Sequence, residues 1–199
     1  MYFDPRPKTQ EEDLFNRENE LKQFENALPY ASVIVITGLR RTGKTSFLDV
    51  ALSKTKHPYI FLDMRDLPIV PSRTDITRKI AAAFNKMDKK WLHTLSYTLR
   101  LVKGVNLGTT SITLDWGEKG TDLTELFDKI DTWAKKNKQR FLLALDEVQL
   151  IRGDKSIPRL HARIADTNRN TITIVTGSEL GLLHGFLGFD NPNSPLYGR

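Results

Sequence analysis

Short apolar runs rich in β-branched residues alternate along this chain with longer segments whose apolar residues recur at helical spacing. The short runs cover residues 33–37, 59–63, 141–145 and 171–176, and their length and composition predict strands. The continuous run over 33–37 is typical of a strand buried on both faces of a parallel sheet. Strands alternating with helices therefore predict an α/β fold with right-handed crossovers.

The segments between these strands predict helices at residues 14–28, 44–53, 72–84, 91–102, 121–138, 157–168 and 179–187. Ser72 and Asp75 have the spacing of a helix-capping pair. Residues 105–114 predict a strand or a hairpin between glycines. We expect one domain over residues 1–199, with a loose lead-in at 1–12 and a helix and hairpin insertion at 91–120, before the third core strand.

Composition narrows the class of protein. The 199 residues are 39% hydrophobic and 27% charged, as in an ordinary globular domain. No run approaches the roughly 20 apolar residues of a membrane helix, and the N-terminus has no apolar signal core, so we expect a cytoplasmic protein without a membrane partner. Cysteine is absent, which excludes disulfides and cysteine-bound zinc. The net charge of +6 permits a nucleic-acid partner, but the basic residues are scattered and favour solvated helix ends.

A phosphate-binding motif follows the first predicted strand. Its eight residues fit GxxxxGK[ST]: Gly38-Leu39-Arg40-Arg41-Thr42-Gly43-Lys44-Thr45, followed by Ser46. The glycines let backbone N–H groups converge on one anion, and the start of the next helix adds partial positive charge. We expect Lys44 to reach the β- and γ-phosphates of ATP and the Thr45 hydroxyl to bind Mg²⁺.

An acid pair ends the third predicted strand, 141–145. Asp146 is placed to hold Mg²⁺, either through water or directly. Glu147 is placed to orient and deprotonate the attacking water. Such a pair favours hydrolysis over phosphoryl transfer to a small molecule. At the end of the fourth strand, Ser178 is a candidate contact for the γ-phosphate or the water, with a simple helix cap as the alternative.

A second motif points in another direction. Asn85-Lys86-Met87-Asp88 matches NKxD, which reads guanine in GTPases. It ends a predicted helix rather than a buried strand, and it precedes the acidic strand. We therefore interpret it as a polar helix end, which leaves ATP as the expected nucleotide.

Taken together, these residues resemble the archaeal ATPase family, within the STAND and AAA+ relatives of P-loop ATPases. The resemblance spans nearly the whole chain and rests on the phosphate loop and on five further segments: Phe15-Asn16-Arg17-Glu18-Asn19-Glu20-Leu21, Leu62-Asp63-Met64-Arg65, Leu145-Asp146-Glu147, Thr176-Gly177-Ser178 and Ser194-Pro195-Leu196-Tyr197-Gly198-Arg199.

The resemblance implies further features. Phe15 and Arg17 should lie near the adenine, and Arg199 stands where an arginine could sense phosphate in the same or a neighbouring subunit. A three-layer P-loop NTPase fold with strand order 5-1-4-3-2 is implied. The family continues past this point with a fifth strand, a helical lid and often a DNA-binding domain, so the chain resembles a truncated fragment.

The leading functional prediction is Mg²⁺-dependent ATP binding and hydrolysis, used as a switch. Three alternatives stay open: a nucleotide-binding module without turnover, a small-molecule kinase whose acceptor pocket is supplied by residues 91–120, and a DNA-associated protein. Besides ATP and ADP, the expected partners are DNA or a protein, bound through regions beyond this chain, and an oligomer is possible.

Overall fold

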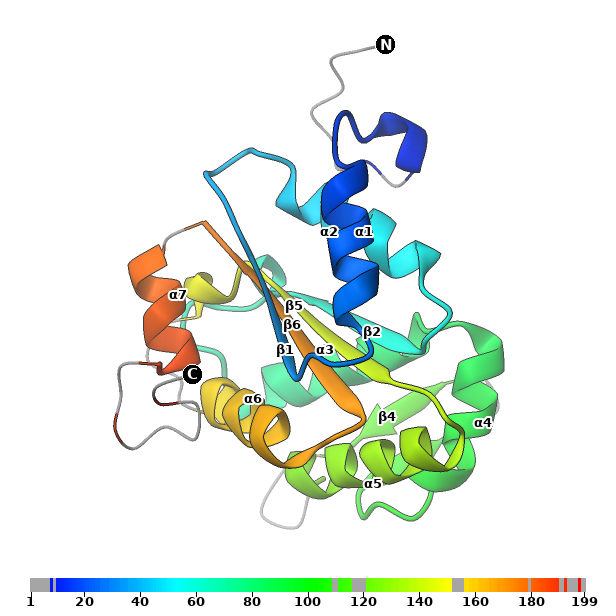
Figure 1. Cartoon of the computed structure of the whole chain (residues 1–199). Helices are drawn as coiled ribbons and strands as arrows, with labels where there is room; N and C mark the ends of the chain where they lie inside the picture. Colours follow the sequence, from blue (N-terminus) through cyan, green and yellow to red (C-terminus); the bar gives the residue numbers. More distant parts are fainter. Residues whose placement is uncertain are drawn as a thin grey trace.

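Four parallel strands form the central sheet of the computed structural model (Figure 1). In spatial order they are β1 (Val33–Thr37), β6 (Thr171–Gly177), β5 (Phe141–Asp146) and β2 (Tyr59–Asp63). The structure describes residues 8, 10–108, 111–115, 121–151, 156–178, 180–189, 192 and 197. In that part of the chain the order matches the expected 5-1-4-3-2 without its fifth strand.

Helices cover both faces of this sheet, because alternate residues of each strand point to opposite sides. On β5, Leu142 and Ala144 pack with α1 (Glu18–Ala27) and α2 (Lys44–Lys54). Phe141, Leu143 and Leu145 pack into a larger core on the other face. That core is built from α3 (Arg73–Asn85), α4 (Lys89–Leu99), α5 (Leu123–Lys136), α6 (Ser156–Thr167) and α7 (Leu180–Leu187). The predicted three-layer α/β fold is confirmed.

The strand β1 differs from the prediction, since it is not buried on both faces. Ile34 and Ile36 pack partly against the α1 and α2 side, but Val35 is 38% exposed and Thr37 is also exposed. The reason is position: in the described part of the chain β1 pairs only with β6 and forms the edge of the sheet. Composition alone does not distinguish an edge strand of this kind from a central one.

The insertion lies far from the phosphate loop. It consists of α4 and the antiparallel pair β3 (Val105–Leu107) and β4 (Ile112–Leu114), as predicted. Asn85, at the end of α3, holds β4 by donating to the Ile112 carbonyl (2.9 Å) and accepting from its N–H (2.6 Å). Figure 1 shows α4 and β4 at the opposite end of the molecule from the loop between β1 and α2.

Helix starts follow local chemistry. At α3, Ser72 and Asp75 form the predicted capping box, in which each side chain accepts from the other residue's backbone N–H. The first helix begins at Glu18, four residues later than predicted. Asn16 explains the difference, because its φ of 54° is left-handed and cannot belong to a right-handed helix. Short 3₁₀ turns are also present at η1 (Glu11–Asp13), η2 (Met64–Asp66) and η3 (Val148–Leu150). None of the described helices is long and apolar enough to cross a membrane.

Candidate active site

The loop between β1 and α2 has the conformation that the phosphate motif predicts. Arg41 and Gly43 adopt left-handed backbone angles (φ 66° and 79°), which turn the chain into the first turn of α2. Gly38 permits a close approach, because a Cβ there would lie 3.1 Å from the Thr42 hydroxyl. Thr42 in turn donates to the carbonyl of Leu39 (2.8 Å) and fixes the loop. Leu39 and Arg40 are exposed on its outer side.

The ammonium group of Lys44 is buried inside this loop. Its Nζ donates to the carbonyls of Gly38 (3.2 Å) and Leu39 (3.1 Å). The same Nζ lies 3.9 Å from Glu147 Oε1. Only 6% of the Lys44 side chain is exposed. The structure therefore brings together the lysine that was predicted to reach the phosphates and the glutamate that was predicted to activate the attacking water.

Asp146, at the tip of β5, is fully buried and accepts hydrogen bonds from three side chains. Thr45 Oγ1 donates to Oδ2 (2.8 Å), Thr176 donates to Oδ1, and Arg65 Nη2 lies 3.3 Å from Oδ2. Burial raises the pKa of Asp146, and these three donors oppose that rise.

The oxygens of Thr45 and Asp146 fit the hard oxygen ligands that Mg²⁺ prefers. No group of three histidine, cysteine or acidic residues within the described ranges could hold a metal by itself. A magnesium ion at this place would therefore rely on these two residues together with phosphate oxygens and water.

Glu147 has a strained backbone and a held carboxylate. Its φ and ψ of 56° and 46° are left-handed, and its N–H donates to Thr176 Oγ1 (3.0 Å). Gln149 Nε2 donates to Glu147 Oε2 and also lies 3.2 Å from Ser178 Oγ. Ser178 Oγ lies 3.5 Å from Glu147 Oε2, and its contact with a phosphate stays a prediction. Sequence reasoning did not identify Gln149, because only the η3 turn brings it back over Glu147.

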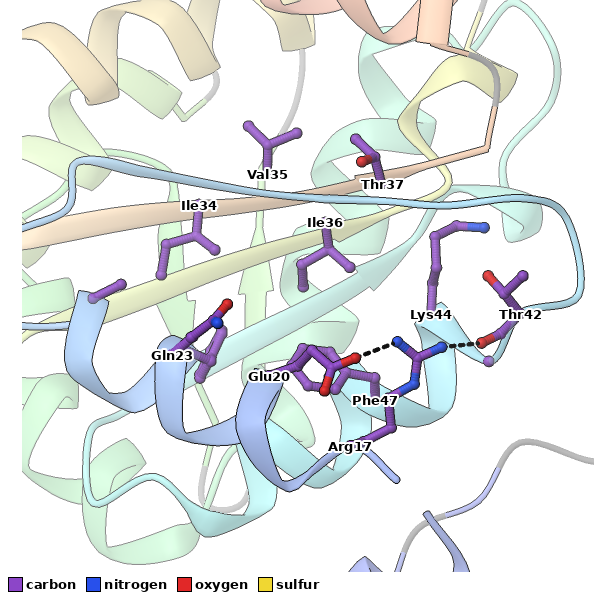
Figure 2. A pocket seen from close by; sticks show the side chains of 13 residues that line it. Arg17, Glu20, Gln23, Ile34, Val35, Ile36, Thr37, Thr42, Lys44 and Phe47 are labelled. Atoms are coloured by element: carbon purple, nitrogen blue, oxygen red, sulfur yellow. Dashed lines mark hydrogen bonds and ion pairs between the residues drawn. The ribbon is translucent and has the colours of Figure 1, made fainter. Parts of the chain in front are cut away.

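A cavity of about 320 Å³ opens beside the loop, between α1, β1 and α2 (Figure 2). Its polar end is formed by Thr42, Gly43 and Lys44, and much of the rest is apolar, with Phe24 and Phe47 among the lining residues. Figure 2 shows Arg17 between Glu20 and the loop; it donates to Glu20 Oε1 (2.8 Å) and to the Thr42 carbonyl (3.1 Å).

The other predicted site residues lie in different places. The Phe15 side chain is 94% exposed and is not among the residues that line the cavity. The Ser46 hydroxyl, nearly buried, accepts from the Lys8 backbone N–H (2.9 Å). Arg199 lies outside the described residues, so its role in sensing phosphate stays a prediction.

Arg65 belongs to the segment Leu62-Asp63-Met64-Arg65 that carries part of the family resemblance, but no role was predicted for it. This residue follows β2 in the η2 turn. Its guanidinium makes three hydrogen bonds of 2.7–3.0 Å to the Asp63 carboxylate, besides its contact with Asp146. The pattern Asp-x-Arg at a strand end was the signal that could have identified it.

The NKMD segment has the structural role that was expected of it. Asn85 binds β4, Met87 is buried, and Asp88 caps α4 by accepting from the Lys90 N–H (2.8 Å). These contacts are those of a helix end and a helix start, and Asn85 uses both atoms of its side-chain amide on β4.

Comparison with known proteins agrees with the geometry. No protein-family model and no curated protein matches the chain. Among solved structures, a Walker-type ATPase of Pyrococcus abyssi is similar over all of this chain, with 31% identity and a TM-score of 0.75. Cdc6p from Pyrobaculum aerophilum is similar over 94% of the chain, with 15% identity and a TM-score of 0.52, a likeness of fold alone.

The chain spans only 55% of the first of these proteins and 46% of the second, so about half the length of each. The sheet order, the loop after β1 and the acid pair after β5 correspond to one known architecture. The chain has the α/β fold of P-loop NTPases, and its structural relatives include a Walker-type ATPase.

Proposed function

We propose that this chain binds ATP with Mg²⁺ in the loop after β1 and hydrolyses the β–γ phosphoanhydride bond. One observation carries the proposal. Thr45 and Asp146, 101 positions apart in the sequence, are hydrogen-bonded at 2.8 Å, and Lys44 and Glu147 lie next to them. A glycine turn with a purely structural role would not need this convergence.

The binding step uses the loop and the neighbouring cavity. The backbone of residues 38–46 and the N-terminus of α2 would surround the phosphates, with Lys44 turning from the Gly38 and Leu39 carbonyls to the phosphate oxygens. The apolar part of the cavity, where Phe24 and Phe47 lie, suits a flat base. Arg17 stands at its edge, which supports a role near the nucleotide. A contact between Phe15 and the adenine stays a prediction.

For the chemical step, we assign Glu147 as the general base. It would take a proton from water as the water oxygen attacks the γ-phosphorus and the bond to the β-phosphate oxygen breaks. Ser178 and Gln149 would orient its carboxylate, because both lie within hydrogen-bonding reach of Oε2 or of one another. Mg²⁺ held by Thr45 and Asp146 would neutralise charge on the phosphate oxygens.

Binding without turnover is the second candidate. In the observed conformation Gln149 donates to Glu147 Oε2 and Lys44 faces Oε1, so the carboxylate has to release one of these contacts before it can take a proton. The kinase alternative lacks such support, since the insertion lies away from the phosphate loop (Figure 1). We further propose that ATP turnover acts as a switch and that the protein forms an oligomer. DNA or a protein partner would bind through regions beyond this chain, which spans about half the length of its structural relatives.

Binding is tested first, by titrating labelled ATP into the chain with Mg²⁺ and adding GTP as competitor. We expect saturable ATP binding that Lys44→Ala abolishes and that GTP displaces poorly. Asp88→Ala serves as a matched control, because the NKMD segment has no role in the proposed pocket. Binding that survives in Lys44→Ala would contradict the assignment of the loop.

Turnover is tested separately with Glu147→Gln. Because the amide keeps the shape of the carboxylate but cannot take a proton, we expect phosphate release to fall on the order of 10²-fold or more while ATP binding remains. Glu125→Gln, on α5, makes the same chemical change away from the site and should leave the rate unchanged. Equal phosphate release by wild type and Glu147→Gln would contradict the role of Glu147, and no release by either would favour binding without turnover.

A further inference from the structure

Two carboxylates lie side by side at the tips of β2 and β5. Asp63 and Asp146 are register partners in the parallel pair, so they leave the sheet at the same edge. Asp49, on α2, is close enough that both of them raise its pKa, which burial and these charges bring to about 6. Like charges this close repel one another in a partly buried setting, and the arrangement needs a counter-charge.

Arg65 supplies that counter-charge. Its Nε and Nη2 donate hydrogen bonds to the two carboxylate oxygens of Asp63, and the same Nη2 lies 3.3 Å from Asp146 Oδ2. Burial raises the pKa of Asp63, but the hydrogen bonds from Arg65 outweigh this effect and hold it below its ordinary value. The guanidinium therefore bridges the two strand tips.

The bridge ends on the oxygen that the proposed function needs. Asp146 Oδ2 accepts from Thr45 Oγ1 at 2.8 Å and also faces Arg65 Nη2. A magnesium ion bound by Thr45 and Asp146 would compete with Arg65 for the same oxygen, Asp146 Oδ2. The Asp63 contacts are the shorter ones, and 45% of the Arg65 side chain is exposed. Arg65 can thus give up the Asp146 contact while Asp63 keeps it anchored.

We propose that Arg65 is a positioning residue that occupies the cation place beside Asp146 and competes with Mg²⁺ for it when no nucleotide is present. This inference rests on the proposed function, because that function assigns Asp146 to the metal. It gives Arg65 two effects. It holds the metal-binding carboxylate in place for Thr45, and it keeps the empty site from filling with Mg²⁺ before the phosphates arrive.

The test measures thermal unfolding during a titration with MgCl₂ alone, without nucleotide. In the wild type we expect little stabilisation by Mg²⁺. In Arg65→Gln the carboxylates lose their counter-charge, so we expect a lower unfolding temperature without metal. The Mg²⁺ concentration needed for half-maximal stabilisation should fall at least about tenfold, as removing one neighbouring positive charge implies.

A matched control is Arg163→Gln. Arg163 also makes a two-bond pair with a carboxylate, Asp128, at 2.8 and 2.9 Å, and among the described residues this contact bridges no second carboxylate. It should leave the Mg²⁺ response unchanged. In the double variant Arg65→Gln with Asp146→Asn, the gained response should disappear, which locates it at Asp146 and excludes a general effect of net charge.

The inference is overturned if wild type and Arg65→Gln respond to MgCl₂ alike. If Arg65→Gln does not fold, Arg65→Lys replaces it. A single ammonium cannot reproduce the planar bridge, so Mg²⁺ should stabilise Arg65→Lys more than it stabilises the wild type. Equal stabilisation of the two proteins would again contradict the proposed role of Arg65. ATP binding measured on the same samples separates the two claims. Absence of ATP binding in the wild type would contradict the proposed function. A Mg²⁺ response that is the same in Arg65→Gln and the wild type would contradict the role of Arg65.

Discussion

At the scale of single residues, two of the four described non-glycine residues with a left-handed backbone, Arg41 and Glu147, lie where the chemistry is proposed. Glu147 keeps a left-handed backbone although it is not glycine, a conformation that costs of order 1–3 kcal/mol. The bond from its N–H to Thr176 Oγ1 helps to hold it there, and the consequence is that its carboxylate turns back toward Lys44. Lys138 has a similar backbone at the end of α5, so the role proposed for Glu147 rests on this contact with Lys44 and not on the backbone angle.

His161 gives a prediction about pH. It lies on α6 with 1% of its surface exposed, and neither ring nitrogen has a hydrogen-bond partner among the described residues. Burial lowers its pKa from 6.5 to about 4. Between these two pH values the imidazole of His161 is protonated in the unfolded chain and neutral in the folded chain. The free energy of unfolding should therefore fall as the pH drops from about 6.5 to 4, by about 3 kcal/mol at most.

His161→Leu should remove this dependence. Urea unfolding at several pH values in that window would show a stability difference between variant and wild type that grows as the pH falls. The comparison is needed because Asp49, whose pKa is raised to about 6, acts in the opposite direction in both proteins. A difference that does not change with pH would contradict the buried, neutral state of His161.

At the scale of elements, a carboxylate on α5 fixes the start of β6. Asp131 accepts from the Asn170 N–H (2.7 Å), from Asn170 Nδ2 (3.2 Å) and from Thr171 Oγ1 (3.0 Å). We expect Asp131→Ala to lower the free energy of unfolding by about 2 kcal/mol, since three partly buried donors lose a charged partner. Chemical denaturation would measure the change.

Asp128→Ala is the natural control for that experiment. Asp128 lies one turn earlier on α5 and pairs with Arg163, but both side chains are about 40% exposed. An exposed pair contributes at most about 1 kcal/mol. Equal losses for the two variants would show that the tie between α5 and β6 is no stronger than a surface ion pair.

At the scale of the whole molecule, ligand binding should stabilise the fold, because the proposed pocket joins α1, β1 and α2 and exists only in the folded chain. ATP with Mg²⁺ at a hundred times its Kd should add about 2.7 kcal/mol. For a chain of this size that corresponds to a rise in Tm on the order of 5–10 °C. Differential scanning fluorimetry would detect it, and a rise of the same size in Lys44→Ala would contradict it.

The sequence by itself was sufficient for most of the fold. The bounds of β1 and β2 agree with the apolar runs, and the hairpin at 105–114 and the capping box at Ser72 also follow from local patterns. The phosphate loop, Asp146 and Glu147 were predicted in the same way, and the structure brings them together, while their roles stay predictions. Local physics explains this success, since apolar periodicity, glycine positions and caps act between residues a few positions apart.

Only the tertiary structure decided which side chains meet. Arg65 and Asp146 are 81 positions apart, and Gln149 and Glu147 meet through a single 3₁₀ turn. Burial is also a property of the whole chain: among the described residues, His161 has no hydrogen-bond partner and β1 forms an edge of the sheet, because of what packs beside each of them. Contacts between distant residues and their burial depend on how strands and helices are arranged around one another, and no local pattern contains that information.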